Sequence, residues 1–206
     1  MATTTRSNSS RERILESAEA EILNKGFTGT SIDDIIDRAS ITKGGFFYHF
    51  DGKVGLAEAL VERYLVQDDE IFSGLLTEAR ELTEDPLHRL LIFLKLLAQK
   101  FGNLPETHPG CLVASFTYES VHFNDRVREL MRTGIFSWRE MVIEQLKEVD
   151  EQYTMIADVS HETLADMFTV VIEGGIVLAR NLEQNQLLAN QILAYRTFVR
   201  MLYGAS

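Results

Sequence analysis

The stretch from residue 31 to residue 50, SIDDIIDRASITKGGFFYHF, decides how the first quarter of the chain folds. Thr30 or Ser31 can cap a short helix that carries three isoleucines on one side, which predicts an amphipathic helix. A tight turn of three or four residues follows, and Thr42 can cap a second short helix through KGGFFYH. Two short helices joined in this way form a helix-turn-helix.

The second of these helices is predicted to carry the chemistry of the motif. It would turn Thr42, Lys43, Gly44, Gly45 and Tyr48 outward, where its first residues could meet base edges and its free backbone N–H groups could face phosphates. Glycine has no side chain, so the helix backbone could approach a duplex closely. The phenylalanines of the same helix are expected in the core, at positions 46, 47 and 50.

Outside this stretch, apolar residues recur at every third or fourth position and alternating strand patterns are absent, so the predicted fold class is all-α with about nine helices. Helices are expected at 10–25, at the two short segments, at 53–81, from 86 to about 102, and at 111–121, 125–150, 161–181 and 185–203. The coarse division is a three-helix head over residues 1–60 and a larger helical body over residues 61–206.

The distribution of charge limits where a nucleic acid could bind. The chain has a net charge of −11, of which residues 1–60 carry −2 and the remainder −9. A polyanion is repelled by such a body, so non-specific nucleic-acid binding is disfavoured. Any such site must be local, in the N-terminal quarter, where Arg6, Arg11 and Arg13 lie with a single acid among the first 15 residues.

The composition indicates the cellular compartment of the protein and whether disulfide, redox or metal sites are expected. No apolar run approaches the ~20 residues that span a bilayer, and the start of the chain lacks the apolar core of a secretory signal. With one cysteine, Cys111, an intramolecular disulfide is impossible, so we expect a cytoplasmic protein. An inert, buried Cys111 is favoured over a redox sensor, and the five histidines show no metal-ligand spacing.

The last two expected helices each carry an apolar stripe with alternating spacings of four and three residues. Such stripes fit seams between helices that cross at shallow angles, either inside one chain or between two copies. A dimer interface is the favoured interpretation. Its candidate residues are Leu164, Phe168, Val171, Gly175, Leu178, Leu188, Ile192, Tyr195, Val199 and Leu202.

The residues from Arg11 to Leu60 resemble the DNA-binding head of the TetR family of bacterial transcriptional regulators. The likeness rests on KGFTGTSIDDI, ASITKGGFFYHF and DGKVGLAEAL, which keep their relative spacing. It covers about a quarter of the chain. The resemblance implies a two-domain, all-helical homodimer that needs no cofactor, whose heads bind a palindromic double-stranded DNA operator and whose bodies bind a small-molecule effector.

The resemblance also implies roles for particular positions. Residues 42–45 would open the recognition helix, and Lys53 would match a phosphate-binding lysine of the family. Further contacts to the DNA would come from Thr28, Thr30, Ser31, Tyr48 and His49. For His49, a packing role is an equal alternative.

Three positions depart from the family pattern. Ile36 stands where a small alanine is usual, Ser40 stands where the turn usually has glycine, and Phe47 stands where a tyrosine usually donates a hydrogen bond to phosphate. If residue 40 needs a positive φ, serine costs about 1 kcal/mol there. These departures affect single contacts rather than the family resemblance.

An effector cavity is implied for the body, although aromatic residues in a helical core are more often ordinary packing. The candidate pocket residues are Phe93, Phe101, Cys111, Phe116, Glu119, His122, Trp138, Phe168 and Glu173. Short enzyme motifs such as a P-loop, a nucleophile elbow or HExxH are absent from the sequence. The sequence therefore predicts a DNA-binding regulator: a repressor that a small-molecule effector releases from its operator. The alternative is a helical ligand-binding or protein-interaction module without operator binding.

Overall fold

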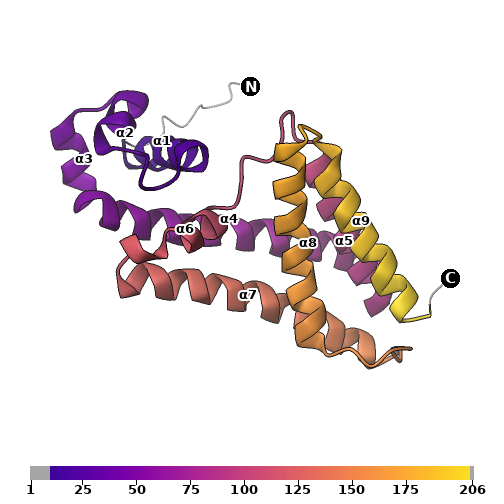
Figure 1. Cartoon of the computed structure of the whole chain (residues 1–206). Coiled ribbons are helices and arrows are strands. Elements are labelled where there is room, and N and C mark those ends of the chain that lie inside the picture. Colours follow the sequence, from indigo (N-terminus) through magenta and orange to yellow (C-terminus); the bar gives the residue numbers. More distant parts are fainter. Residues whose placement is uncertain (1–9, 205–206) are drawn as a thin grey trace, which may run out of the picture. The chain divides into compact units, whose positions relative to one another are not determined.

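The computed structural model describes residues 10–204, and every regular element in that range is helical (Figure 1). The all-α class and the number of helices predicted from the sequence are confirmed. No helix within 10–204 is both long and apolar enough to cross a membrane. The elements are α1 (Ser10–Lys25), α2 (Ile32–Ala39), α3 (Lys43–His49), α4 (Gly52–Leu82), α5 (Pro86–Gly102), α6 (Leu112–Tyr118), the 3-10 turn η1 (Ser120–His122), α7 (Asp125–Asp150), α8 (His161–Asn181) and α9 (Gln186–Leu202).

Local sequence signals set several of these helix ends. Gly26 follows α1 with a φ of +79°, and its N–H donates to the carbonyl of Ile22 at 2.8 Å, as a left-handed helix cap requires. Pro86 is the first residue of α5, where its missing N–H costs nothing. The carboxylate of Asp85 caps the same helix by accepting the N–H of His88 at 2.8 Å.

The chain forms two compact units. Of the described residues, the first unit contains 10–64 together with 111–131, and the second contains 65–110 and 132–204. Helices α4 and α7 each contribute residues to both units. The boundary expected near residue 60 did not assign 111–131 to the head. That assignment depends on long-range packing, which no local periodicity records.

The core of the first unit joins distant parts of the chain. Phe46 of α3 is buried, and the ring of Phe27 packs against Phe116 and Phe123 with centroids 5.5 and 4.6 Å away. Burial of such apolar side chains stabilises the unit by about 25 cal/mol per Å². Other buried members of this core are Ile14, Leu15, Ala18, Ile22, Ile35, Ile36, Phe50, Leu56 and Leu60.

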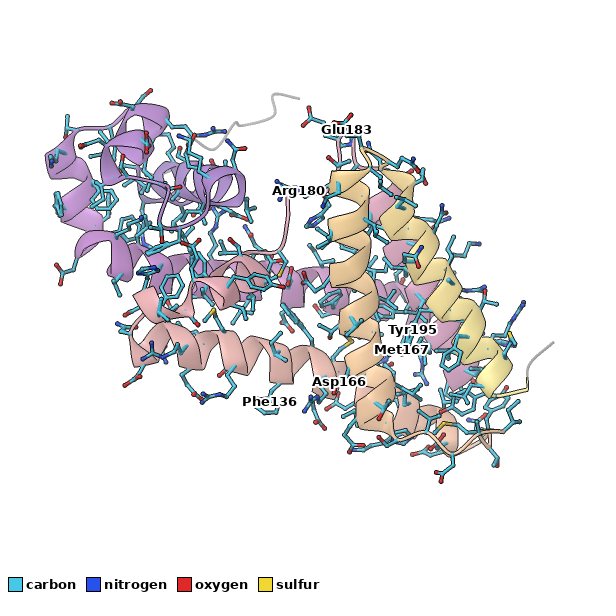
Figure 2. All side chains as sticks on the ribbon, viewed as in Figure 1. Phe136, Asp166, Met167, Arg180, Glu183 and Tyr195 are labelled. Atoms are coloured by element: carbon cyan, nitrogen blue, oxygen red, sulfur yellow. The ribbon has the colours of Figure 1, made fainter. Side chains whose placement is uncertain are left out.

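The second unit packs α9 against both α5 and α8. Gly175 of α8 allows the close approach, because a Cβ there would lie 2.8 Å from Cδ1 of Leu188 on α9. The hydroxyl of Tyr195, which is labelled in Figure 2, donates to the carbonyl of Leu164 at 2.8 Å. The Nε of Arg196 donates at 2.8 Å to a carbonyl of α5. Helices α5, α8 and α9 therefore share one core.

This packing corrects the dimer-interface prediction for most of its residues. The stripes of α8 and α9 face each other and α5 within one chain, so their side chains cannot be offered to a second copy. The buried members are Leu164, Phe168, Gly175, Leu188, Ile192, Tyr195, Val199 and Leu202. Val171 is half-buried, and Leu178 is exposed. Helical spacing locates an apolar stripe but does not tell which partner covers it.

The same two helices expose a second set of apolar side chains. On α8 these are Val170, Val177 and Leu178, with Leu182 directly after the helix, and on α9 they are Leu193, Phe198 and Met201. Val177 and Leu178 follow Val170 by seven and eight residues, and Met201 follows Leu193 and Phe198 by eight and three, so each set lies along one broad side of its helix. This exposed set, called the α8–α9 outer face below, is separate from the buried seam.

Candidate nucleic-acid interface

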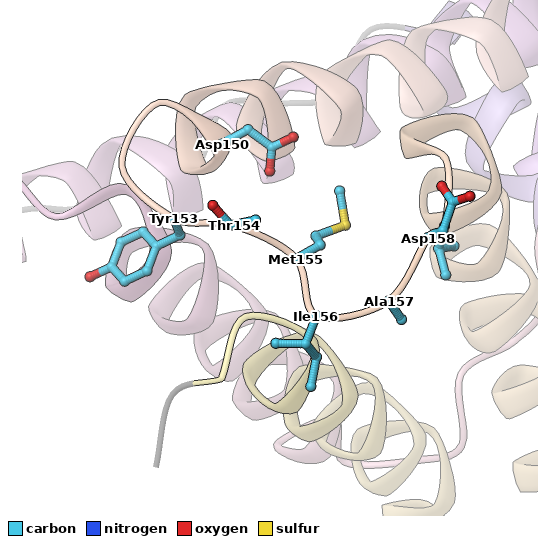
Figure 3. A pocket seen from close by; sticks show the side chains of 8 residues that line it. Asp150, Tyr153, Thr154, Met155, Ile156, Ala157 and Asp158 are labelled. Atoms are coloured by element: carbon cyan, nitrogen blue, oxygen red, sulfur yellow. The ribbon is translucent and has the colours of Figure 1, made fainter.

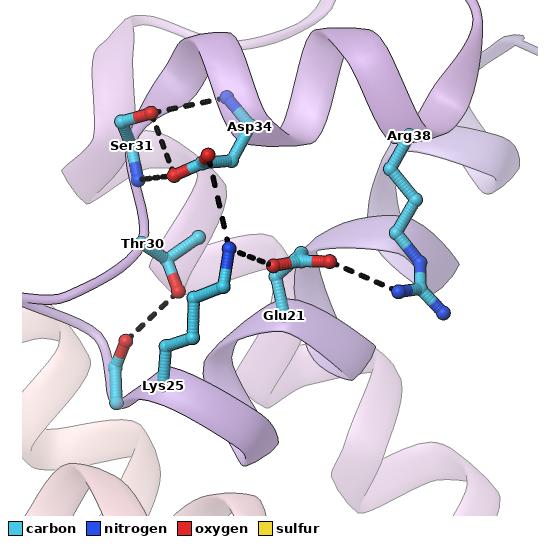
Figure 4. Close-up of polar contacts among 7 residues, drawn as sticks. Glu21, Lys25, Thr30, Ser31, Asp34 and Arg38 are labelled. Carbon is cyan, nitrogen blue, oxygen red and sulfur yellow. Dashed lines mark hydrogen bonds and ion pairs between the residues drawn. The ribbon is translucent and has the colours of Figure 1, made fainter.

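A hydrogen-bonded cap fixes the start of α2. The hydroxyl of Ser31 accepts the N–H of Asp34 at 3.0 Å, and the carboxylate of Asp34 accepts the N–H of Ser31 at 2.8 Å, which completes a capping box (Figure 4). Lys25 of α1 pairs with Glu21 at 2.7 Å, and Arg38 of α2 pairs with the same carboxylate at 2.9 Å. These contacts hold α2 against α1 through polar as well as apolar groups.

The turn between α2 and α3 has the conformation that the sequence analysis considered costly. Ser40 has φ 52° and ψ 53°, in the left-handed region, and its N–H donates to the carbonyl of Asp37 at 3.2 Å. Thr42 then caps α3, since its hydroxyl oxygen accepts the N–H of Gly45 at 3.1 Å. The predicted helix-turn-helix is therefore present, with the caps predicted for both of its helices.

Helical phase divides the aromatic residues of α3 and its end. Phe46 and Phe50 are four residues apart and both buried, as predicted. Phe47 is 50% exposed and Tyr48 is 84% exposed. The prediction of a buried Phe47 is wrong because each residue turns about 100° around the helix, which takes it off the face of Phe46.

The start of α3 presents little steric bulk. Apart from the adjacent residues and the backbone of α3 itself, no heavy atom lies within 4 Å of the place where a Cβ on Gly44 would stand, so this position opens to solvent. The Lys43 side chain is 68% exposed, and its ammonium lies 3.6 Å from the carboxylate of Asp33, an ion pair that contributes little in water. Lys43 is therefore available to an external partner.

His49 is half-buried at the end of α3. Its Nε2 lies 2.6 Å from the hydroxyl of Ser10, and its ring contacts those of Tyr48 and Phe50. These contacts give His49 a packing role within the head.

The side chain of Lys53 contacts Phe27 of the same unit. Its ammonium donates to the carbonyl of Phe27 and lies 4.2 Å from the centroid of the Phe27 ring, as in a cation–π contact. Burial lowers the pKa of Lys53, although the charge of Glu119 opposes that shift. A phosphate contact through Lys53 would have to compete with these contacts.

The hydroxyl groups of the three threonine and serine residues before and at the start of α2 all form hydrogen bonds within the protein. Thr30 is 1% exposed, and its hydroxyl donates to the carbonyl of Gly26 at 2.9 Å, so the structure contradicts its prediction as a phosphate contact. Ser31 serves the capping box. The hydroxyl of Thr28 donates to the carboxylate of Glu119. Short polar side chains cap and close turns as readily as they bind phosphate, and the spacing alone does not separate these roles.

The sequence had suggested that Glu119 lines a pocket in the body. In the structure it belongs to the first unit and binds backbone groups there. Its carboxylate accepts the N–H groups of Phe27 at 2.6 Å and Thr28 at 2.7 Å, so it anchors the α1–α2 connection to the segment after α6. Burial alone would raise the pKa of Glu119, but the hydrogen bonds from Thr28 and Phe27 outweigh it and lower the pKa. No local motif marks this residue in the sequence.

The other pocket candidates divide between the two units. In the first, Cys111 is buried and its Sγ caps α6 by accepting the N–H of Ala114 at 3.4 Å. Phe116 is buried against Phe123, and His122 is exposed. The nine candidates therefore do not form one site.

In the second unit, Phe93 and Phe168 form a buried cluster with Phe72, with centroids 6.3–6.4 Å apart. Phe101 packs against His108, where burial and the charge of Arg180 lower the pKa of His108. Glu173 is half-buried on α8, and Trp138 lines a cavity between α4 and α7.

That cavity has a volume of about 180 Å³ and lies within the second unit. Its lining residues are Leu65, Asp69, Phe72, Ser73, Leu76, Thr133, Gly134, Ser137, Trp138 and Met141. Apart from Trp138, sequence reasoning did not select this set for the pocket. The small residues that create the space carry no signal of their own.

A second hollow borders the connection between α7 and α8 (Figure 3). It is lined by Asp150 and residues 153–159. The carboxylate of Asp150 is already bound to the hydroxyl of Tyr203 and to Nε2 of His161, both at 2.8 Å. The carboxylate of Asp150 therefore links α7 to His161 of α8 and to Tyr203 at the end of α9. Within residues 10–204, no group of three or more His, Cys, Asp or Glu side chains is placed to hold a metal ion.

Comparisons with known proteins agree with this architecture. Residues 14–60 match the family described as bacterial regulatory proteins of the tetR family, and residues 86–195 match the tetracyclin repressor-like C-terminal domain. The chain is 25% identical over 185 residues to the HTH-type transcriptional repressor DhaR of Mycobacterium sp. strain GP1, which covers 89% of this chain and 88% of that protein. It is also 25% identical over 170 residues to the transcriptional regulator AcuR of Cereibacter sphaeroides, covering 82% and 75%.

Solved structures show the same fold. A TetR transcriptional regulator from Chloroflexus aurantiacus has a TM-score of 0.76 and 26% identity, covering 92% of this chain and 93% of that one. The reduced form of E. coli NemR has a TM-score of 0.74 at 20% identity, covering 91% and 95%. These proteins are regulators, not enzymes. Together with the capped helix-turn-helix, the two family matches show that this chain belongs to the TetR family of bacterial transcriptional regulators and is a DNA-binding protein.

Proposed function

We propose that the protein is a repressor that binds a palindromic operator as a homodimer and is released by a small-molecule effector bound in its body. The observation that carries this proposal is the surface of α3. There a capped N-terminus, the exposed Lys43, the open position at Gly44 and the exposed Tyr48 face solvent together. Such a surface suits the major groove, where a recognition helix presents its first turn to base edges.

The structure changes the set of proposed contacts. We retain Thr42, Lys43, Gly44, Gly45 and Tyr48, which are on or beside the exposed surface of α3. Thr28 and Ser31 stay as candidates through backbone or side-chain groups near the start of α2, and Lys53 stays as one that must leave Phe27. Thr30 is withdrawn because it is buried.

For a palindrome, two heads must meet half-sites about 34–36 Å apart. We infer that the α8–α9 outer face supplies the dimer contact, because Val170, Val177, Leu182 and Met201 expose apolar surface there. Contiguous exposed apolar surface is typical of protein interfaces. An effector with a higher affinity for the state in which the heads are mis-spaced stabilises that state. It lowers operator affinity by at most the ratio of its own affinities for the two states. Helix α4, which contributes to both units, is the proposed route. Such a regulator would act in the cytoplasm, where the bacterial chromosome lies.

A titration of the chain with the DNA upstream of its own gene, at two salt concentrations, tests operator binding. Lys43→Ala should weaken binding or change base preference, since it removes an exposed cation at the start of α3. If Lys43 meets a phosphate, the slope of log K against log salt falls by ~0.9.

Lys100→Ala is the matched control, because it removes an exposed lysine from α5 in the second unit. Equal binding by both variants would contradict the proposed role of α3. If the protein formed no salt-sensitive specific complex with this DNA or with any genomic fragment, operator binding itself would be refuted.

A further inference from the structure

The cavity between α4 and α7 is built from two facing helical stripes. On α4 its residues follow the spacing 65, 69, 72, 73 and 76, and on α7 they follow 133, 134, 137, 138 and 141. Residues three and four apart lie on the same side of a helix, so each set lines one wall. The cavity is therefore a regular feature of these two helices and not an accident of a loop.

Glycine and serine side chains along the two walls leave the space that forms the cavity. A Cβ on Gly134 would lie 2.4 Å from Cδ2 of Leu65, so the Leu65 side chain packs directly over residue 134 and would have to move if this residue were larger. Ser73 and Ser137 leave space beside that contact, where larger side chains would fill it. The volume of about 180 Å³ is large enough for one aromatic ring, since a cavity of roughly 150 Å³ holds benzene.

The inner wall of the cavity is aromatic and apolar. Trp138 and Leu76 are buried, and the ring of Phe72 contacts those of Phe93 and Phe168 in the core. An aromatic ligand would pack on these rings, and a cation beside them would gain from the negative faces of their π systems. A ligand here would thus contact the same core that joins α5 and α8.

The outer wall carries hydrogen-bond acceptors and one charge. Asp69 is exposed and is the only charged residue that lines the cavity. Among residues 10–204, no cation lies within ion-pair distance of its carboxylate. The hydroxyl of Ser73 donates to the carbonyl of Glu70 at 3.4 Å, which leaves its oxygen able to accept a hydrogen bond. A ligand with N–H donors and a positive charge fits this wall.

The charge of the site also disfavours anionic and neutral ligands relative to a cation. An anionic ligand would lie beside Asp69 with no Lys, Arg or His in the lining to compensate it. A neutral apolar ligand would use the aromatic wall but would give the carboxylate no partner. The net charge of −11 further attracts cations to the protein.

We propose that this cavity binds a small organic cation, an amine that carries a single aromatic ring, with its ring on Trp138 and Phe72 and its ammonium at Asp69. The identification of this ligand as the effector rests on the proposed function; the binding does not. The ring would replace empty space, and the ammonium would pair with the unpartnered carboxylate.

Three single-ring probes test the ligand class: benzylamine, benzyl alcohol and benzoate. Trp138 is the only tryptophan of the chain, so its fluorescence reports directly on the cavity. Benzylamine should bind more tightly than benzyl alcohol by about fivefold, the effect of one partly exposed ion pair. Benzoate should bind more weakly than the alcohol.

Two variants and one control locate the site. Asp69→Asn should remove the preference for the amine while leaving the alcohol affinity within about twofold. Glu70→Gln removes a charge from the neighbouring position of α4 that does not line the cavity, and it should leave all three affinities unchanged. Ser137→Leu should fill the cavity and abolish binding of both ligands. Circular dichroism of each variant confirms that it is folded.

The outcomes separate this proposal from the proposed function. An amine preference that Asp69→Asn abolishes supports the site. No binding of any probe, equal affinity for amine and alcohol, or an unchanged preference in Asp69→Asn overturns it, whether or not the unliganded protein binds its operator. Release of operator DNA by benzylamine, in the wild type but not in Asp69→Asn, would identify the class as the effector. Operator binding without any such release would remove the effector role.

Discussion

At the residue scale, the head is held by polar groups whose roles differ from those that their positions suggest. Lys53 lies beside Phe27, Thr30 closes a turn, and Glu119 anchors the α1–α2 connection. In each case the side chain binds a part-buried backbone group of the first unit instead of making the contact predicted for it. An unsatisfied buried backbone group costs about 1–3 kcal/mol. A side chain that can bond such a group therefore stabilises the protein more by doing so than by pointing into solvent.

Glu119→Ala should destabilise the protein by about 1–3 kcal/mol, because two backbone N–H groups would lose their acceptor. Urea unfolding at pH 7 measures the loss. Glu106→Ala is the control, since Glu106 is exposed in a loop. Equal stabilities of the two variants would contradict the anchoring role.

The same carboxylate predicts a pH dependence. Because the pKa of Glu119 is lowered in the folded protein, its contribution is present above the unfolded value of about 4.3 and is lost as pH falls through the lower folded pKa. Glu119→Ala should therefore be closest in stability to the wild type at the acid end of that window. A difference that stayed constant from pH 7 to pH 3 would contradict this assignment.

Ser40→Gly should stabilise the protein by about 0.5–1 kcal/mol, because glycine adopts the positive φ of this turn without steric cost. The gain is limited by the greater freedom of glycine in the unfolded chain. The midpoint of urea unfolding measures it. Ser73→Gly, inside α4, should lower stability instead, and a loss of stability in Ser40→Gly would show that the serine is not strained.

At the element scale, α3 and α8 show how one helix serves two purposes. In α3, the buried Phe46 and the exposed Tyr48 are separated by about 200° of helical rotation, so the same seven residues contribute to the core and to the proposed DNA surface. In α8, one side packs on α9 and another exposes Val170 and Val177. Amphipathic periodicity predicts the inward side of each helix well, whereas the outward side needs the tertiary structure.

Adjacent glycines in α8 offer a matched test of this packing. Gly175→Ala should destabilise the protein by about 1–3 kcal/mol, because the new Cβ would meet Leu188 at 2.8 Å. Gly174→Ala should stabilise it by up to about 1 kcal/mol, since the new Cβ would meet no atom within 4 Å outside its own helix backbone and adjacent residues, and alanine is the better helix former. Thermal unfolding distinguishes them. The opposite order would contradict the α8–α9 seam.

At the scale of the whole molecule, the proposed function depends on the assembly of two copies of the chain. The seam once expected between two copies lies inside one chain, and the α8–α9 outer face remains exposed. Its apolar side chains are the proposed contact between protomers. The acidic charge of the chain disfavours DNA binding outside the head, so the proposed contacts are local to α3, and on a palindromic operator they would have to match the spacing of two half-sites.

Val177→Glu should convert the proposed dimer to monomers in sedimentation velocity, because a charge buried in an apolar interface lacks a partner. Val121→Glu, at an exposed apolar position in the first unit, is the control and should leave the assembly unchanged. The monomeric variant should bind the palindrome more weakly than the wild type. A Val177→Glu protein that stayed dimeric would move the interface elsewhere.

The sequence by itself determined the helices, their caps, the helix-turn-helix and the family. These features follow from local propensity, periodicity and short-range spacing, as at Ser31, Thr42 and Gly26. Only the tertiary structure decided the partner of each surface: that 111–131 joins the head, that Glu119 binds backbone, and that the stripes of α8 and α9 face each other. Contacts between residues far apart in the chain depend on how helices meet in space, and helical periodicity carries no record of which helix lies opposite.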